Sequence, residues 1–230
     1  MGIINKIKNI FTGGNTLYYP GCLTKFALPN IFENYCEILK NLGIEFITLS
    51  DNEFCCGSPV LNAGFADDFY DLKKKNHDFF KNYGISKIIT NCPSCFYMFK
   101  KHYPKLEVEH ITQTIHKKLK KIPQKFKDQI TYHDPCHLGR KSNIYIQPRE
   151  IINKLGFEII ELTENKVNSL CCGGGGGLIN NFPELSNKIA NLRLSQSKTK
   201  KLVTPCPMCY KHFKNNAKNM EILEFSELLI

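Results

Sequence analysis

Residues 90–95 read Thr-Asn-Cys-Pro-Ser-Cys, and residues 204–209 read Thr-Pro-Cys-Pro-Met-Cys. In both places a short apolar, β-branched run precedes the first cysteine, which predicts that a strand ends there. The proline directly after that cysteine suits the first turn of a helix. The same strand–cysteine–helix unit therefore occurs twice, at Cys92 and at Cys206.

Further cysteines precede each unit in the same order. The adjacent pair and glycine of Cys55-Cys56-Gly57 recur as Cys171-Cys172-Gly173. Ten of the eleven cysteines thus form two copies of one motif, which we name the first motif (Cys22, Cys55, Cys56, Cys92, Cys95) and the second motif (Cys136, Cys171, Cys172, Cys206, Cys209). The eleventh, Cys36, lies on the apolar face of a predicted helix, and we expect it to be a core residue.

Each half of the chain alternates short strands with amphipathic helices. The predicted strands are 17–19, 45–49, 87–90, 129–133, 157–162, 201–204 and 221–225, and the predicted helices are 28–42, 64–83, 147–155, 183–197, 207–216 and one after Pro93. This alternation predicts an α/β fold with parallel sheets, and the duplication predicts two tandem domains related by a pseudo-twofold axis. Because ligands bind beyond the carboxyl ends of parallel strands, we expect the five cysteines of each half to converge at one sheet edge.

The repeat also suggests where the domains begin and end. We expect an N-terminal extension over 1–15, a first domain over 16–116, a linker over 117–128 and a second domain over 129–230. The linker is the most basic part of the chain, with Lys117, Lys118, Lys120, Lys121, Lys125 and Lys127 around Pro123. The formal net charge of +10 is concentrated there, so it favours a solvated linker over a nucleic-acid interface.

Cysteine usage and hydropathy together predict a cytoplasmic protein. No apolar run is long enough to cross a bilayer, and the N-terminus has no signal-peptide core, so membrane association is expected only peripherally, through a partner. In that compartment thiols stay reduced, and clustered cysteines indicate metal sites more often than disulfides.

Five thiolates exceed the needs of a common metal site. Structural zinc takes four ligands, and a regular cubane iron–sulfur cluster also takes four. Five ligands suit a cluster of unusual shape, in which one thiolate bridges two irons. The five glycines from Gly173 to Gly177 let the backbone approach the sulfurs, whereas Gly57-Ser58-Pro59 does so less well.

The repeated pattern of Cys, Cys-Cys-Gly and Cys-Pro-x-Cys resembles the cysteine-rich CCG domain family. That family includes the B and D subunits of heterodisulfide reductase and iron–sulfur subunits of glycolate, lactate and glycerol-3-phosphate oxidation systems. The stretch from Tyr132 to Arg140, Tyr-His-Asp-Pro-Cys-His-Leu-Gly-Arg, is similar to the second motif of the D-type subunits. The resemblance implies that each five-cysteine motif binds a non-cubane [4Fe-4S] cluster, so that all ten motif cysteines are cofactor ligands. In some members of the family the first motif is thought to carry zinc instead, and because the first motif here has the glycine-poor loop, zinc stays open for it.

Three functions follow from this resemblance and remain open. The first is an enzyme subunit that reduces a small disulfide substrate at the clusters, in a heterodisulfide reductase-like complex. The chain lacks a ferredoxin-like Cys-x-x-Cys-x-x-Cys region, so electrons would come from a ferredoxin-like or flavin-containing partner subunit. The second is an electron relay from a flavin-dependent 2-hydroxy acid or glycerol-3-phosphate dehydrogenase towards quinone. The third is a zinc-binding scaffold without redox chemistry.

Residues beside the first cysteine of each motif are the candidate catalytic groups. His137 could donate a hydrogen bond or proton near the second motif. Arg140 and its counterpart Lys25 could attract an acidic substrate or satisfy a helix end. His133, at the end of a predicted strand, is expected to serve packing. The remaining histidines are expected at the surface: His77, His102, His110, His116 and His212.

Overall fold

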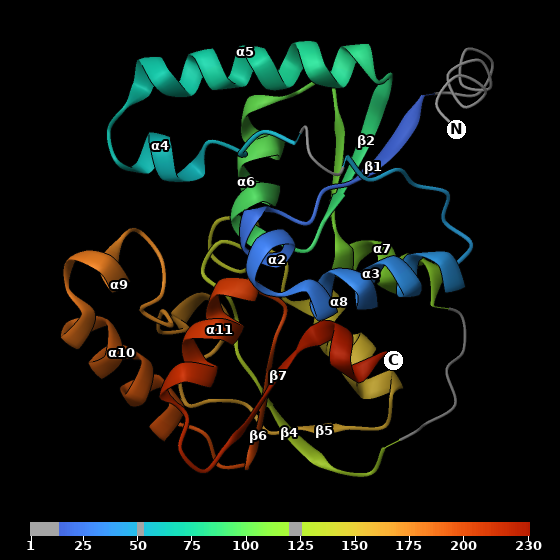
Figure 1. The fold of residues 1–230 in the computed structure, drawn as a ribbon. Helices are drawn as coiled ribbons and strands as arrows, with labels where there is room; N and C mark the ends of the chain where they lie inside the picture. Colours follow the sequence, from blue (N-terminus) through green and yellow to red (C-terminus); the bar gives the residue numbers. More distant parts are fainter. Residues whose placement is uncertain (1–13, 50–52, 120–125) are drawn as a thin grey trace.

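The computed structural model describes residues 14–49, 53–119 and 126–230. Two parallel sheets form the frame of the molecule (Figure 1), one in each half of the chain. The first has the order β1-β2-β3, with β1 Asn15–Tyr18, β2 Ile85–Thr90 and β3 Glu107–His110. The second has the order β5-β4-β6-β7, with β4 Gln129–Tyr132, β5 Glu158–Ile159, β6 Lys201–Thr204 and β7 Glu221–Glu224. The predicted α/β fold of two duplicated, parallel-sheet domains is confirmed.

Helices cover both sheets and follow the same order in each half. The first half has α2 Cys22–Ala27, α3 Pro29–Asn41, α4 Ser58–Asn62, α5 Ala66–Asn82, α6 Pro93–His102 and α7 Ile111–Lys118. The second has α8 Ile146–Lys154, α9 Leu178–Asn181, α10 Pro183–Ser195 and α11 Pro207–Asn216, with 3₁₀ turns η1 Lys166–Asn168 and η2 Phe225–Leu228. Both α6 and α11 begin at the proline that follows a motif cysteine, as the sequence predicts.

Two of the predicted strands are shorter in the structure. Over 45–49 only Ile47 pairs, as an isolated parallel bridge to Leu17, and the predicted strand 157–162 is reduced to β5. Both segments lie at the edge of a sheet, where each can pair on one side only, and both continue into the loop that carries the adjacent cysteine pair. Pairing therefore stops where the chain turns towards the cysteines.

The end of the first half also differs from the prediction. β3 and α7 were not predicted, and α7 extends to Lys118, past the expected start of the linker at residue 117. Lys117 donates to the buried carboxylate of Glu109 at 2.6 Å, so it is part of a packed element. Residues 120–125 of the predicted linker and residues 1–13 of the predicted N-terminal extension lie outside the described residues, whereas Phe126, near the expected end of the linker, stacks on Phe157 with ring centres 4.3 Å apart.

The two halves share their hydrophobic cores. One core contains Tyr35 of α3 together with Ile130 and Phe213 of the second half. The other core, formed mainly by the first half, also contains Leu138 and Ile144 of the second half. Each domain therefore completes the core of the other. In Figure 1, α2, α6 and α11 lie near the middle of the molecule, between the two sheets.

A buried polar contact joins the halves at α3. Tyr35 donates its hydroxyl to Glu224 Oε1 at 2.8 Å, and the backbone N–H and hydroxyl of Ser226 donate to Glu224 Oε2 at 2.8 and 2.6 Å. The Glu224 side chain is fully buried, and burial raises its pKa from the ordinary value of 4.5 to about 7.

No helix in the described part of the chain is long and apolar enough to span a membrane.

We predict that Glu224 makes stability depend on pH. Because the folded pKa lies above the unfolded one, the unfolded chain releases this proton first, and stability falls as pH rises from about 4.5 to about 7. The free energy of unfolding of Glu224→Gln, relative to that of the wild type, should therefore rise by about 2–3 kcal/mol from pH 5 to pH 8. Urea unfolding at each pH measures this difference. Glu221→Gln, at an exposed position of the same strand, is the control. A difference between Glu224→Gln and wild type that stays constant with pH would contradict the prediction.

Candidate metal centres

The five cysteines of the first motif come together from three segments. Cys22 is the first residue of α2, Cys92 precedes α6 and Cys95 lies in its first turn, and the adjacent pair lies in the loop before α4. The thiols are close enough to shift one another's pKa: Cys55 and Cys95 lower the pKa of Cys56, and Cys56 and Cys92 raise that of Cys95. Cys22 is close enough to Cys92 and Cys56 for these thiols to raise its pKa, after the larger effect of burial. The predicted convergence is therefore observed.

The second motif has the same arrangement. Cys136 and Cys172 lower the pKa of Cys171, and Cys172 and Cys206 raise that of Cys209, so these thiols are close neighbours. The sulfurs of Cys172 and Cys209 are 3.2 Å apart. Cys36 packs against the core outside both motifs, as predicted.

Backbone amides point at the sulfurs of both adjacent pairs. Gly57 and Gly173 have the same left-handed φ of 84°, and each N–H donates to the first sulfur of its pair, Cys55 or Cys171, at 3.4 Å. A Cβ at Gly173 would lie 2.8 Å from a backbone oxygen, so only glycine fits there. In the second motif Gly174 adds a further N–H to Cys172 at 3.3 Å. In the first motif the backbone N–H of Ser58 is hydrogen-bonded to Cys56 and lowers its pKa, so both loops offer a second amide to their cysteine pair.

Crowding makes the two thiol sets strong cation sites. A hydrogen bond from Cys55 lowers the pKa of Cys56, and one from Cys136 lowers the pKa of Cys171 to about 2. The pKa of Cys55 is raised by its interaction with Cys56 and then by burial, and the pKa of Cys136 is raised by its interaction with Cys171 and then by burial. Five clustered thiols can ionise together only if positive charge compensates them. The donor set therefore fits a metal ion or an iron–sulfur cluster.

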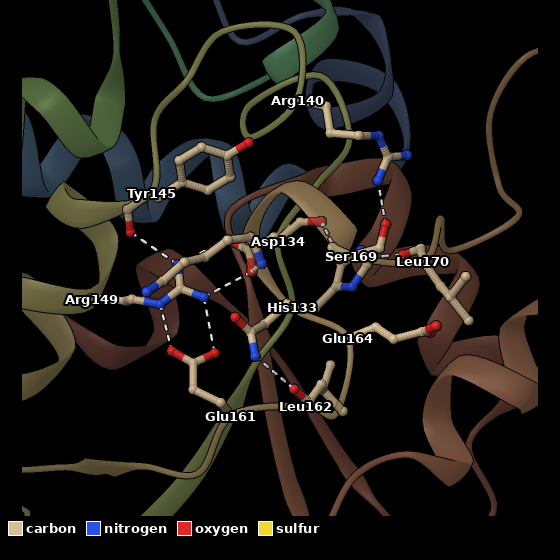
Figure 2. A network of polar contacts seen from close by, with 12 residues as sticks. His133, Asp134, Arg140, Tyr145, Arg149, Glu161, Leu162, Glu164, Ser169 and Leu170 are labelled. Atoms are coloured by element: carbon tan, nitrogen blue, oxygen red, sulfur yellow. Dashed lines mark hydrogen bonds and ion pairs between the residues drawn. The ribbon is translucent and has the colours of Figure 1, made fainter.

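An ion-pair network fixes the segments that carry the second motif (Figure 2). The Asp134 carboxylate accepts two hydrogen bonds from Arg149, both 2.8 Å long, and Arg149 also binds Glu161 at 2.6 and 2.9 Å. Asp134 accepts the backbone N–H of Lys166 at 2.8 Å, and its carbonyl accepts the hydroxyl of Ser169 at 3.1 Å. Asp134 thereby ties the loop of Cys136 to the segment that runs into Cys171.

A fully buried arginine continues this network. Arg193 donates from Nη2 to the Ser169 hydroxyl at 2.8 Å and from Nη1 to the Glu164 carbonyl at 2.7 Å. Its Nε donates to His133 Nδ1 at 3.1 Å. The His133 ring is buried against Phe213, so the predicted packing role is observed, together with a polar contact that the sequence did not indicate.

The three candidate catalytic residues have different surroundings. His137 Nδ1 is 3.3 Å from Cys136 Sγ, and burial, with Lys141, lowers the pKa of His137 against the opposing influence of Cys171 and Cys56. The ring therefore lies within electrostatic reach of both motifs. Arg140 donates to the carbonyl of Ser169 (Figure 2), a contact between the same two segments that Asp134 joins.

Lys25 has a local role as well. It donates to the Leu49 carbonyl at 3.3 Å and lies 3.9 Å from the Glu53 carboxylate. Both basic candidates thus hold the loops that precede a cysteine pair, which is a structural use of their charge.

A basic cleft of about 510 Å³ opens beside His137. Its walls are α6, β3 and the loop 141–144, which belong to different halves of the chain. The ammonium groups of Lys101 and Lys141 lie 5.7 and 5.1 Å from the centre of the Tyr97 ring, and Lys141 Nζ is 3.3 Å from His137 Nε2. His137 therefore separates the cleft from Cys136. Sequence reasoning missed this cleft because its residues come from both halves and form no local motif.

The prediction of surface histidines was wrong for two of the five. His110 is fully buried, where it caps α7 and lies 3.3 Å from the Asn91 carbonyl, and burial lowers its pKa to about 3. His212 is buried against Ser186. His102 and His116 are partly buried, and His77 is exposed as predicted. The buried rings fill polar niches beside the cysteine segments, which helical or strand periodicity does not show.

The family model for the CCG cysteine-rich domain matches residues 16–100 and 130–214. The chain belongs to the CCG family. Each of its two CCG domains contains one complete motif.

Three relatives illustrate the range of the family. An iron–sulfur protein of Methanocaldococcus jannaschii is 34% identical over 89% of this chain and 42% of its own length. The D-type subunit of the dihydromethanophenazine:CoB–CoM heterodisulfide reductase of Methanosarcina acetivorans is 29% identical over 94% of this chain and 58% of its own length. EtfAB:quinone oxidoreductase of Syntrophomonas wolfei is 31% identical over 92% of this chain and 32% of its own length. The chain spans about half the length of the first two.

Among solved structures, glutamate racemase RacE1 from Bacillus anthracis is similar over 94% of this chain and 78% of its own. The TM-score is 0.41 and the identity 12%, which is too little to bear on function.

We predict that the Asp134 network carries much of the stability of the second domain. Asp134→Ala leaves Arg149 with one carboxylate and the Lys166 N–H without its acceptor, and should lower the free energy of unfolding by about 3 kcal/mol. The control is Asp128→Ala, which removes an exposed pair with Lys201 and should cost less than about 1 kcal/mol. Equal losses in the two variants, measured by urea unfolding, would show that the network is not a stabilising one.

Proposed function

We propose that this chain is the iron–sulfur subunit of a heterodisulfide reductase-like complex and reduces a small disulfide substrate with electrons from a partner. The observation that carries the proposal is the convergence of five thiols in each half, close enough to shift one another's pKa. The ten motif cysteines would hold two [4Fe-4S] clusters of non-cubane form, with zinc as the other occupant of the first motif.

The residues present fit such clusters. The donors are sulfurs, as iron–sulfur clusters require, and backbone amides of Gly57, Gly173 and Gly174 stabilise negative charge on them. A cluster bound there supplies electrons one at a time. Burial of Cys56, Cys95, Cys172 and Cys209 excludes water from the sulfurs, whereas Cys22 is exposed, which leaves one side of the first motif open to a redox partner.

The basic cleft supports a small acidic disulfide as the substrate class. Glu109 is neutralised by Lys87 and Lys117, whereas Lys101 and Lys141 have no ion pair within the described residues. The cleft therefore keeps unpaired positive charge close to the Tyr97 ring, which suits a carboxylate or sulfonate. His137 lies between this charge and Cys136, so it is placed to orient a substrate sulfur and to hold a proton for a released thiol.

The partners follow from the relatives. The D-type relative from Methanosarcina acetivorans is by name one part of a larger reductase complex, and this chain spans 58% of its length. We therefore expect a ferredoxin-like iron–sulfur or flavin-containing protein to supply the electrons, in the cytoplasm or peripherally on a membrane.

A second candidate is an electron relay with no substrate of its own. Similarity to EtfAB:quinone oxidoreductase favours it, because that relative is named for transfer between a flavoprotein and quinone. The exposed Cys22 suits this function as well.

We predict about eight irons and eight acid-labile sulfides per chain in protein purified without oxygen. Cys136→Ser should lower both to about four, because only the second motif loses a ligand. Cys36→Ser, outside the motifs, is the matched control and should keep all of them. About four irons with one zinc in the wild type would assign zinc to the first motif and favour the relay. Zinc alone after reconstitution with iron and sulfide would contradict both redox functions.

We predict that dye-reduced protein cleaves small disulfides that carry carboxylates or sulfonates. Lys141→Glu reverses a charge in the cleft and should raise KM for such a substrate about tenfold, with a smaller change in kcat. Lys198→Glu makes the same charge change at an exposed site outside the cleft and should not alter KM. Rapid electron transfer to a quinone analogue, without cleavage of any disulfide, would favour the relay instead.

A further inference from the structure

Tyr19 and His133 occupy equivalent positions, directly after β1 and β4. The Tyr19 ring packs edge-on against Phe99 with centroids 4.8 Å apart at 84°, and the His133 ring packs against Phe213 at 4.8 Å and 85°. Both rings are buried. The scaffold therefore places an aromatic ring at the same point beside each motif, and only the chemistry of the ring differs.

The polar atoms of the two rings have different partners. The Tyr19 hydroxyl donates to the Phe54 carbonyl at 2.8 Å, in the loop before Cys55. His133 receives the Arg193 Nε–H at Nδ1, at 3.1 Å. Its Nε2 is buried without a hydrogen-bond partner within the described residues. A ring nitrogen of His133 and the sulfurs of Cys172 and Cys209 all lie within 4.8 Å of one another.

The contact with Arg193 assigns the proton on the ring. A guanidinium can only donate, so Nδ1 must accept, and the ring hydrogen is then on Nε2. Histidines that bind metals use an unprotonated nitrogen and donate a hydrogen bond through the other one. His133 has the reverse arrangement. Its Nε2 therefore carries a hydrogen to donate and is not set up to ligate a metal, and this N–H has no acceptor within the described residues.

We propose that His133 is a positioning residue that donates an N–H···S hydrogen bond from Nε2 to the sulfurs of the centre held by Cys172 and Cys209, and that this bond raises the reduction potential of the second centre above that of the first. The inference rests on the proposed iron–sulfur clusters. A reduced cluster carries one more negative charge, and a hydrogen bond to its sulfurs stabilises that charge. The hydroxyl of Tyr19, bound to a carbonyl, offers the first centre no such donor.

The asymmetry gives electron flow a direction. The first motif has the exposed Cys22, where a redox partner can approach, and the second motif adjoins His137 and the basic cleft. A higher potential at the second centre collects electrons on the side of the cleft.

A pair of matched variants isolates the donor. Both His133→Asn and His133→Gln remove the ring. Asparagine keeps an acceptor near the Nδ1 position for Arg193 and places no donor near Nε2, whereas glutamine can place an amide N–H there. Tyr19→Phe is the control in the first half, because it removes a hydroxyl that faces a carbonyl. The readouts are iron and sulfide content and an EPR-monitored redox titration of protein purified without oxygen.

We expect His133→Asn to retain its iron and to shift one centre only. At a fixed applied potential its reduced-to-oxidised ratio should fall about tenfold, which corresponds to about 59 mV for a one-electron couple. His133→Gln should stay within about threefold of the wild type, and Tyr19→Phe should leave both centres unchanged.

Two outcomes would overturn the inference while leaving the proposed function intact. The first is that His133→Asn keeps its full iron content but neither reduction potential changes, or that His133→Asn and His133→Gln shift the potential equally. The other is loss of half the iron from both variants, which would make His133 a ligand. Absence of iron from the wild type would overturn the proposed function itself, and this inference with it.

Discussion

The mutual repulsion of buried thiolates is the constraint on which the rest of the structure depends. Each half brings five cysteines close enough to shift one another's pKa, and the thiolates of Cys56 in the first half and of Cys171 and Cys206 in the second are favoured at the cost of their neighbours. Such a cluster is stable only if a cation binds it or if the protons stay on most sulfurs. Amide N–H groups and firmly anchored loops reduce the cost of holding the sulfurs together before any metal arrives.

The anchoring follows from parallel-sheet topology. Cys92 and Cys206 lie at the carboxyl ends of central strands, where the chain must turn into a helix, and the prolines after them fix that turn. The adjacent pairs come from edge segments that leave their sheets early. These segments have few ladder bonds, so polar contacts hold them instead, chiefly Asp134 and Arg149 in the second half.

How far the sequence predicts this molecule depends on the range of each interaction. The repeat of Cys-Cys-Gly and Cys-Pro-x-Cys predicts the sheets, most of the helices and the convergence of the thiols, because each unit contains the local sequence signals for its own strand, turn and helix. Contacts between distant segments carry no local pattern. Arg193 reaches His133 across 60 positions, and Tyr35 reaches Glu224 across 189, so the buried network and the shared core were not predicted.

Departures from the internal symmetry are the most informative positions for function. Duplication alone would give two equal centres, and Phe99 and Phe213 show how closely the scaffold repeats. Against that background two differences lie beside the second motif: His133 stands in place of Tyr19, and His137 lies between Cys136 and the cleft. Both place a histidine ring near the sulfurs, and a ring N–H donated to sulfur would stabilise the reduced, more negative state of a cluster bound there. A relay needs two centres that pass electrons onward, whereas a site that collects electrons beside a substrate cleft needs the second to be the stronger acceptor. A higher potential at the second centre, as we propose, would suit a site that reduces a substrate held in the adjacent cleft.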